Sequence, residues 1–349
     1  MERFSAPNKG KDMTKSQLIY ALPARCGACG AAILPWLSGV RDRVHLVNGV
    51  WDLYRCSDKN CCCGYLDAAL TPEQLGGFYS TYSTHSDPVL NASGAKRLFR
   101  NAIGWFIHRN LDYARPDVSP LVKTLGWLFR FFPVLYHTAC SRVFWLPYKR
   151  NGKLVEIGYG NAQTLLQMRD LGWDVEGIEF DPLCIEKARA YGLRACGGDF
   201  FEQDYGDGSL DAVVGSHVIE HVPDPGRLID AIYAKLAPGG RMVLVTPNAN
   251  SLGCAVFGRN WRGLEAPRHL TIHTPGSLTS HAERAGFKTI RLFGTPLGGG
   301  ILEQSHQICR GKTYGRTRRI ARLGWVLAAS VVHTVMPLRS EEIVLFCEK

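Results

Sequence analysis

The strongest constraint on the fold is the alternation of short apolar runs with amphipathic stretches that begins at Lys153. Strands are expected at 153–157, 174–179, 193–196, 210–215, 241–246, 287–293 and 342–348. Helices fit 161–171, 182–190, 225–236, 275–285 and roughly 315–336. Strands that alternate with helices form a parallel sheet covered on both faces. We therefore predict a doubly wound α/β domain over 151–349, with a mostly parallel seven-stranded sheet and a helical insertion at about 300–340.

The chain ahead of this domain divides into three stretches of different composition. Residues 1–20 are polar and basic and are expected to form a loose N-terminal tail. Residues 21–90 hold short β-type runs between Gly and Cys turns, followed by one short helical piece. Residues 91–150 are aromatic and basic and indicate a helical connector, with breaks at Pro116, Pro120, Pro133 and Pro147.

Two short cysteine pairs stand out in residues 21–90. Cys26 and Cys29 are separated by two residues, and Cys56 and Cys61 follow with four residues between them. Two such pairs, joined by a β-type insert, can close four thiolates around a tetrahedral zinc ion. We choose Cys61 over its neighbours as the fourth ligand. Four thiolates leave no open coordination position, so the predicted zinc is structural, and the alternative is a set of buried thiols without metal.

Polar and glycine residues follow three successive strands of the predicted sheet. Gly158 and Gly160 allow a tight turn and a close approach of the backbone to a ligand. Glu179 ends the next strand, 21 residues after Gly158, where a carboxylate can accept hydrogen bonds from both hydroxyls of a ribose. Asp199 follows the third strand and can accept a hydrogen bond from an adenine amino group. Together these residues predict an adenosine site at the carboxyl edge of the sheet.

The type of nucleotide follows from what this segment lacks. A dinucleotide-binding turn has a third glycine where this chain has Gln163, and the segment carries no Walker lysine. A cofactor without phosphate is therefore favoured. The segment resembles the class I S-adenosylmethionine-dependent methyltransferases in Glu156-Ile-Gly-Tyr-Gly-Asn-Ala162, Gly177-Ile-Glu-Phe-Asp-Pro182, Gly198-Asp-Phe200, Leu210 to Pro225 and Leu236-Ala-Pro-Gly-Gly240. The resemblance covers roughly 151–294 and the final strand.

The resemblance implies a Rossmann-like methyltransferase fold and S-adenosylmethionine as the cofactor. It implies contacts with the methionine part from Glu156, Gly158 and Gly160, and with the ribose from Glu179. It also implies adenine contacts from Asp199 and Phe200, and a sulfonium side lined by Ser216 and His217. One departure is Ala162, where many relatives carry a third glycine. The stretch from Arg55 to Cys61 also resembles the zinc-ribbon leader found ahead of certain bacterial methyltransferases, and that likeness extends to His85.

The acceptor side of the predicted enzyme lies in the segment after the fifth strand. His269 has a resting pKa suited to a general base, and Arg268 can hold an anionic group. A structural histidine that caps the loop is the alternative. In the relatives that this segment resembles, acceptors are small molecules or sugars. We therefore expect methyl transfer to a small molecule or a sugar or glycan precursor.

The stretch from His217 to His221 resembles a zinc-peptidase motif, but its position in the chain argues against that chemistry. His217-Val-Ile-Glu-His221 matches the pattern of some zinc peptidases, which require both histidines on one sustained helix. A strand ends at His217, and Pro223 and Pro225 prevent such a helix. Peptidase chemistry is therefore not expected.

Two basic stretches bear on the partners of the protein, whose net charge is +10. Residues 96–150 hold ten Lys/Arg against two acids, and a second cluster runs over 310–322. Such patches attract phosphate in nucleic acid, lipid headgroups or nucleotide-linked substrates. A ribosomal-RNA methyltransferase that grips RNA through a zinc ribbon is one alternative, although no Asn-Pro-Pro-Tyr-type motif follows the fourth strand. A non-catalytic adaptor is another alternative.

Aromatic and apolar residues are interleaved with the basic ones in 123–147 and 310–336. This mixture favours a peripheral association with anionic membrane lipid, with nucleic acid the less favoured partner. The first twenty residues lack a secretory pattern, and no stretch reaches the ~18 apolar residues that span a bilayer. We expect a cytoplasmic protein, with a peripheral position at the inner face of the membrane. In that compartment the twelve cysteines are thiols or metal ligands rather than disulfides.

Overall fold

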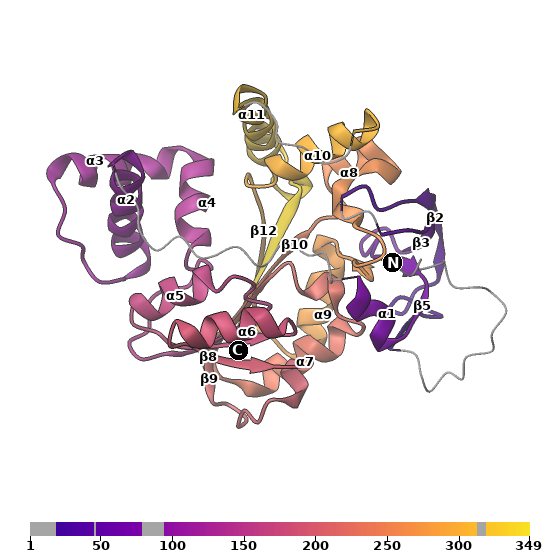
Figure 1. Ribbon diagram of the computed structural model, residues 1–349, viewed down its shortest axis with the longest axis horizontal. Helices are drawn as coiled ribbons and strands as arrows, with labels where there is room; N and C mark the ends of the chain where they lie inside the picture. The colour runs from indigo at the N-terminus through magenta and orange to yellow at the C-terminus, as the bar shows by residue number, and fades with distance from the viewer. Residues whose placement is uncertain (1–18, 45–46, 79–93, 313–318) are drawn as a thin grey trace.

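The computed structural model describes residues 19–44, 47–78, 94–312 and 319–349. An α/β body occupies the centre, the helices α2 to α4 gather on one side of it, and the small strands β2 to β5 lie on the other (Figure 1). Most of the expected tail at 1–20, and residues 79–85 of the leader-like stretch, fall outside the described residues.

The central sheet has seven strands in the order β12-β13-β10-β9-β6-β7-β8. These are β6 (Lys153–Ile157), β7 (Asp174–Glu179), β8 (Arg194–Gly197), β9 (Leu210–Ser216), β10 (Leu236–Pro247), β12 (Thr289–Thr295) and β13 (Glu342–Glu348). The pairs from β10 through β9, β6 and β7 to β8 are parallel, whereas β13 is antiparallel to both β10 and β12. The predicted fold class, a doubly wound and mostly parallel sheet, is confirmed.

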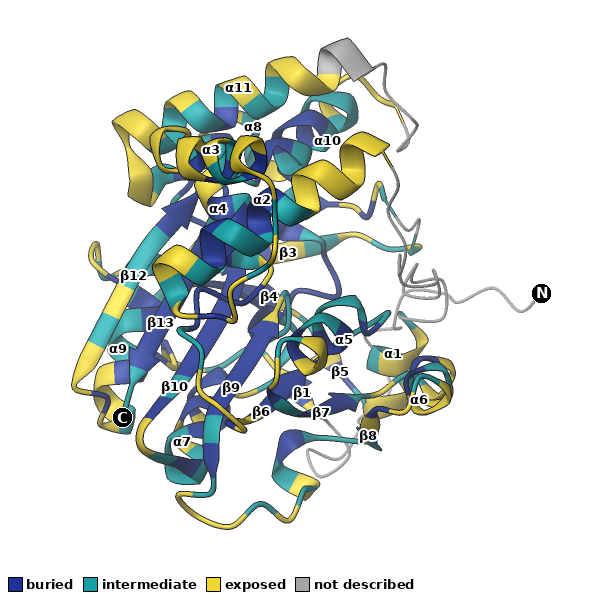
Figure 2. Ribbon diagram, turned by 90° about the vertical axis from the view of Figure 1, so that its left-hand side faces the viewer, coloured by how far each residue is buried: buried dark blue, intermediate teal, exposed yellow. Residues whose placement is uncertain are grey.

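The two faces of this sheet build two separate cores because successive side chains of a strand point to opposite faces. On β6, Leu154 packs with α5 (Gln163–Asp170) and α6 (Pro182–Ala190). Its neighbour Val155 packs with α7 (Pro225–Lys235) and α9 (Pro275–Ala285). The strands are therefore mostly buried between two helical layers (Figure 2).

The expected helical connector consists of α2 (Gly94–Leu111), α3 (Pro120–Leu128), a 3-10 turn η2 (Phe129–Phe131) and α4 (Pro133–Ser141). Pro120 and Pro133 sit at the first positions of their helices, where a missing N–H costs no hydrogen bond. They therefore start helices as well as separating them. Buried residues of α2 and α4 join the core that covers one face of the sheet.

A small four-stranded sheet forms the cysteine-rich module, in the order β11-β4-β3-β2. Three strands come from the N-terminal part: β2 (Ile33–Val40), β3 (Trp51–Cys56) and β4 (Gly64–Asp67). The fourth, β11 (Thr271–Ile272), comes from the segment after β10 and pairs with β4. A second pairing joins β1 (Tyr20–Ala21) to β5 (Ala69–Leu70), and α1 (Pro72–Gly77) is the expected short helical piece. The α/β body therefore completes the sheet of the module.

The remaining helices follow β10 and β12. They are α8 (Leu252–Phe257), α10 (Gly299–Cys309) and α11 (Arg319–Val335), and α10 packs on α8 and α11. Short 3-10 turns connect the elements at η3 (Phe200–Glu202), η4 (Ile219–His221), η5 (Gly258–Asn260), η6 (Arg262–Leu264) and η7 (Pro337–Arg339). Within the described ranges, no helix is both long and apolar enough to pass through a bilayer.

Candidate functional site

The glycine turn after β6 forms one wall of the site. Gly158 and Gly160 have φ values of 66° and 55°, a left-handed conformation that favours glycine. The N–H of Gly158 donates to the carbonyl of Ile178 on β7 at 2.8 Å, and a Cβ on Gly158 would meet a methyl of Val218 at 2.6 Å. Ala162, which stands in place of a third glycine, is itself left-handed with φ 58°. The departure from the family pattern therefore leaves the shape of the turn intact.

Glu179 at the end of β7 is bonded to this turn. One carboxylate oxygen accepts from the N–H of Gly160 at 3.0 Å, and the other accepts from the N–H of Phe180 at 2.8 Å. The side chain predicted to bind a ribose therefore lies beside the glycine turn, at the carboxyl edge of the sheet.

Glu156 lies beneath the turn and is almost completely buried. Its Oε2 atom has no hydrogen-bond partner among the residues that the structure describes. Burial, together with the negative charge of Glu179, raises the pKa of Glu156 to about 8. A buried polar atom without a partner is costly, and a cationic ligand group would satisfy it. The orphaned carboxyl therefore fits the ammonium end of a cofactor such as S-adenosylmethionine.

Asp199 and Phe200 start the 3-10 turn after β8. The carboxylate of Asp199 caps this turn, and the backbone N–H of Asp199 donates to the carboxylate of Glu202 at 3.0 Å. Burial raises the pKa of Asp199. The ring of Phe200 is buried in the core with Tyr205, at a centroid distance of 5.6 Å. Phe200 can therefore contact a bound adenine only through its backbone, while its buried ring supports the turn by packing in the core.

Ser216 and His217 end β9, in the middle of the same edge. Ser216 is exposed, and His217 has a left-handed backbone with its N–H donating to Val245 at 2.8 Å. The His217 imidazole lies between two carboxylates: Nε2 is 2.9 Å from Glu342, and Nδ1 is 3.4 Å from Glu220. Burial disfavours the charged ring, but these two contacts outweigh it and raise the pKa of His217 to about 10. At neutral pH the ring is therefore a cation between two carboxylates.

His269, the expected base, lies behind His217 and is 2 % exposed. Its Nδ1 lies 2.8 Å from the carbonyl of Gly263 and must donate to it, because a carbonyl only accepts. Its Nε2 is 3.8 Å from Glu220 and 3.6 Å from Glu265. Burial, together with the neighbouring His221, lowers the pKa of His269 to about 3, so the ring is neutral at pH 7. The sequence indicated neither this burial nor the contact with Glu220.

Glu220 joins the two histidines and was not among the expected site residues. It is 1 % exposed, and Thr246 donates to its Oε2 at 2.9 Å. Its burial opposes ionisation, but the neighbouring imidazoles of His217, His269 and His221 outweigh this and lower the pKa of Glu220 to about 2. The set-aside motif that runs from His217 to His221 therefore positions a buried carboxylate rather than a helical histidine pair.

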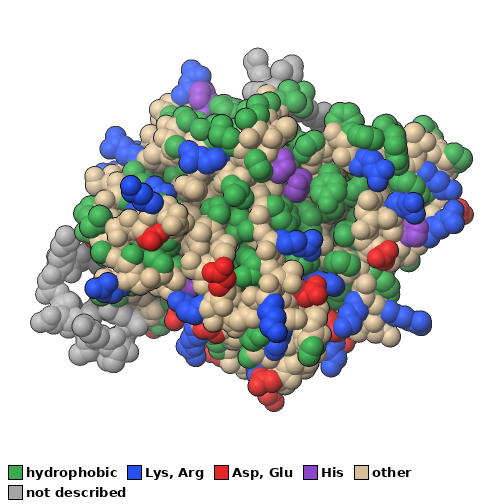
Figure 3. Space-filling view, turned by 180° about the vertical axis from the view of Figure 1, so that it is seen from behind, with side chains coloured by type: hydrophobic (Ala, Val, Ile, Leu, Met, Phe, Trp, Pro, Cys, Tyr) green, Lys and Arg blue, Asp and Glu red, His purple; other side chains and the backbone are tan. Residues whose placement is uncertain are grey.

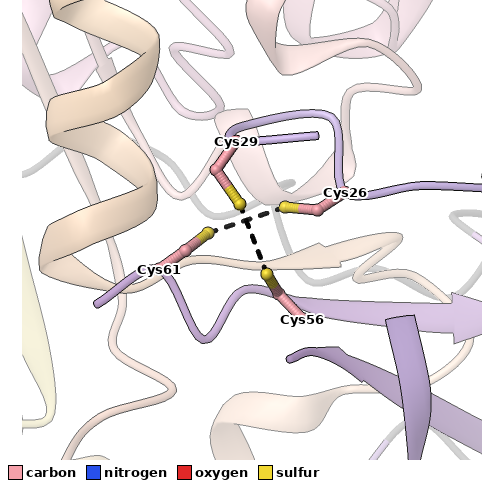
Figure 4. A group of neighbouring side chains, drawn as sticks. All are labelled: Cys26, Cys29, Cys56 and Cys61. Carbon is pink, nitrogen blue, oxygen red and sulfur yellow. Dashed lines mark hydrogen bonds between the residues drawn. The ribbon is translucent and has the colours of Figure 1, made fainter. Parts of the chain in front are cut away.

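The four predicted cysteine ligands converge, as Figure 4 shows. The Sγ atoms of Cys26 and Cys61 are 3.5 Å apart, and those of Cys29 and Cys56 are 3.4 Å apart. All four sulfurs lie within 4.8 Å of one another. A tetrahedral zinc with Zn–S bonds of about 2.3 Å requires S···S separations of about 3.8 Å. The arrangement therefore fits a zinc site with four cysteine ligands.

Contacts around the cluster support this assignment of ligands. Hydrogen bonding with Cys61, and then with Tyr65, lowers the pKa of Cys26 and so favours its thiolate. The two cysteines next to Cys61 contact carbonyl groups instead: Cys62 contacts Asp58, and Cys63 contacts Ile272. The sulfur set therefore consists of the four predicted residues.

The ionisation of His217 can be tested directly. We expect its ring to stay protonated at pH 8, because the carboxylates of Glu220 and Glu342 stabilise the imidazolium. Nitrogen-15 NMR of the histidine rings across pH 5–10 measures this, and His217→Gln assigns the signal. Titration of His217 near the ordinary value of about 6.5 would contradict the geometry.

The comparisons with known proteins concern mainly the α/β body. Residues 135–292 match the family model described as a methyltransferase domain. The chain is 32% identical over 125 residues to a ubiquinone biosynthesis O-methyltransferase of Xanthomonas oryzae, with 33% of this chain and 52% of that protein covered. It is 28% identical over 202 residues to a Mycolicibacterium smegmatis protein named as a probable S-adenosylmethionine-dependent methyltransferase, with 55% and 74% covered. The chain thus spans about half the length of the ubiquinone-type relatives.

Solved structures of methyltransferases also resemble the chain. Phosphoethanolamine N-methyltransferase 2 of Haemonchus contortus, in complex with S-adenosyl-L-methionine, is 17% identical with a TM-score of 0.46, covering 82% of this chain and 63% of that one. A SAM-dependent methyltransferase of Thermotoga maritima is 17% identical with a TM-score of 0.43, covering 70% and 99%. The α/β body therefore carries a match to a methyltransferase domain over 135–292, and its seven-stranded sheet agrees with the predicted fold class.

Proposed function

We propose that the protein is an S-adenosylmethionine-dependent methyltransferase that acts on a small molecule. The observation that carries this proposal is the buried carboxyl of Glu156, whose Oε2 atom has no partner within the described residues, next to a left-handed glycine turn in the segment that matches a methyltransferase domain. When bound, the cofactor supplies a methyl group on a sulfonium, which an acceptor removes by in-line displacement. The protein then has to position the two partners and exclude water.

The residues at the strand ends would each bind a different part of the cofactor. Glu156, with the turn of Gly158 and Gly160, would hold the methionine part, and Glu179 would hold the ribose. Asp199 and Phe200 would hold the adenine, and Ser216 and His217 would face the sulfonium. The His217 cation lies between two carboxylates, so this group carries net negative charge, which favours a sulfonium nearby.

His269 is our proposal for the base on the acceptor side. At neutral pH the Nε2 atom of His269 carries no proton, whereas His217, with a pKa of about 10, is already protonated. Because burial lowers the pKa of His269 to about 3, the proposal requires that a bound acceptor raise this pKa. A base is needed only for an acceptor that must lose a proton, such as a hydroxyl. The name of the O-methyltransferase relatives supports a hydroxyl acceptor, which we expect on a phenol-like small molecule or on a sugar or glycan precursor.

Cofactor binding tests the proposal first. Glu179→Ala should weaken S-adenosylmethionine binding by about 1–3 kcal/mol, the cost of unpaired ribose hydroxyls and a loosened turn. Titration calorimetry measures this, and Glu186→Ala, which removes an exposed carboxylate on α6, should leave affinity unchanged. A wild-type protein that does not bind the cofactor, or that prefers NAD, would overturn the proposal.

The base is tested by turnover with methyl-labelled cofactor on an acceptor found by screening phenols and sugar nucleotides. His269→Gln should lower turnover by roughly 10²–10⁴-fold at unchanged cofactor affinity, the usual range for a lost general base. His217→Gln should instead lower cofactor affinity. Unchanged turnover in His269→Gln would assign that ring a packing role. Cofactor binding without turnover on any acceptor would favour the adaptor alternative.

We also propose one structural zinc held by Cys26, Cys29, Cys56 and Cys61. Metal analysis after extensive dialysis should find about one equivalent per chain, and Cys29→Ser should lower it and the melting temperature of the module. Cys309→Ser is the matched control, because that cysteine is also exposed but lies on α10. Metal-free protein with an unchanged melting profile would exclude the site.

An anionic lipid surface is the partner that the exposed apolar residues favour. On α11, Leu323, Leu327, Val331 and Val335 recur every four residues and are each at least 59% exposed. Leu121, Phe131 and Phe132 on α3 and its extension are exposed by more than half. Figure 3 shows hydrophobic side chains gathered along the upper part of the molecule, where α11 lies. Basic residues accompany them, including Lys123, Arg130 and Arg322, while Arg316 and Arg318 lie outside the described residues.

This arrangement would place a cytoplasmic enzyme at the inner face of the membrane. Co-sedimentation at physiological salt should show weak binding to anionic vesicles and less to neutral ones, since each basic residue near the surface contributes about 1 kcal/mol. The double substitution Leu327→Glu and Val331→Glu should abolish the binding to anionic vesicles. A gel shift with ribosomal RNA run in parallel should be negative. Tight RNA binding without vesicle binding would instead favour the ribosomal-RNA methyltransferase.

A further inference from the structure

The segment after η5 connects the cysteine-rich module to the proposed acceptor side. We name residues 262–274, from η6 to the end of β11 and the two residues after it, the acceptor-side segment. On one side this segment contacts the module, and on the other it contacts η4, which begins two residues after His217. Each side has its own hydrogen bonds.

The contacts with the module are mostly buried. β11 pairs with β4, and the carbonyl of Leu270 accepts from the N–H of Leu66 and from the hydroxyl of Tyr20, both at 3.0 Å. The hydroxyl of Thr274 donates to the carbonyl of Cys61, one of the four cluster cysteines. At Gly276, just beyond the segment, a Cβ would come within 1.8 Å of the carbonyl of Asn60, next to Cys61. The metal knuckle and the segment are therefore in direct contact.

A buried ion pair adds to this contact. The guanidinium of Arg268 is 0% exposed and lies 3.1 Å from Asp42 of the module, whose side chain is 1% exposed. Arg268 also contacts Glu265 at 3.0 Å within the segment and donates to the carbonyl of Phe78. A buried charge requires its partners, so the segment and the module cannot separate without leaving an unpaired ion.

The opposite side of the segment holds the buried carboxylate and histidines. The N–H of Leu270 donates to the carbonyl of Glu220 at 2.8 Å, and Nδ1 of His221 lies 3.0 Å from the carbonyl of Arg268. The rings of His221 and His269 pack edge to face at 4.7 Å. Movement of Arg268 would therefore displace His269 relative to Glu220.

We infer that the zinc module positions the acceptor side of the active site, with Arg268 as the positioning residue that links Asp42 to His269. This rests on the proposed function, in which His269 serves the acceptor. In this arrangement zinc would fix the loop that carries Cys61. That loop and Asp42 would fix the acceptor-side segment, and the segment would position His269 beside Glu220. The glycine turn at Gly158 makes none of these contacts among the described residues, so we expect the affinity for S-adenosylmethionine to change little when the module loosens.

Hydrogen exchange by mass spectrometry tests this on the full chain, without a known acceptor. Removal of zinc by a chelator should speed amide exchange in 262–274 at least tenfold, while peptides of β6 and β7 and the affinity for S-adenosylmethionine stay unchanged. Asp42→Asn, which removes one charge but keeps the shape, should speed exchange in the same segment with zinc still bound. Asp67→Asn, an exposed carboxylate of the module, should change nothing.

A spectroscopic signature separates positioning from general stability. In Asp42→Asn the NMR signals of the His269 and His221 rings should shift, while the His217 ring keeps its high pKa. Asp42→Glu should restore the wild-type signals. Unchanged exchange in 262–274 after zinc loss, or unchanged ring signals in Asp42→Asn, would overturn the inference. Absence of cofactor binding would overturn the proposed function alone, because the exchange measurement does not require the cofactor.

Discussion

Parallel pairing of five successive strands is the constraint on which the rest of the structure depends. It brings the carboxyl ends of β6, β7, β8 and β9 to one edge of the sheet. The hydrogen bond from the N–H of Gly158 to the carbonyl of Ile178 holds the glycine turn against the end of β7. Glu179 then reaches the N–H of Gly160 from the neighbouring strand. Residues far apart in sequence meet at this edge because parallel strands in register end on the same side of the sheet.

Ionic contacts extend this edge into the rest of the molecule. His217, which follows β9, lies between Glu220 and Glu342, and Glu220 also lies 3.8 Å from the neutral ring of His269. The segment that carries His269 also completes the sheet of the cysteine-rich module. Because buried charges need partners, this chain of contacts fixes the module against the catalytic domain. The exposed apolar residues of α11 lie outside this network.

Local patterns in the sequence were enough to predict the sheet and the glycine turn after β6. Apolar runs bounded by glycine gave strands within a few residues of β6, β7 and β9, and the cysteine spacing selected the sulfurs that converge. Contacts between distant residues left no local signal. β11 is only two residues long, and Arg268 meets Asp42 across 226 positions. The burial of His269 follows from those contacts, so the sequence indicated its chemistry but not its surroundings.

The central claim is that the buried carboxyl of Glu156 receives the cationic end of the cofactor. Its pKa of about 8 means that it is mostly protonated at pH 7 in the free protein and must lose that proton to pair with an ammonium group. Calorimetric titration of S-adenosylmethionine at pH 7, in buffers of different ionisation enthalpy, counts protons released on binding. The account predicts a release approaching one proton per cofactor that disappears in Glu156→Gln. Equal proton release by wild type and Glu156→Gln would contradict it.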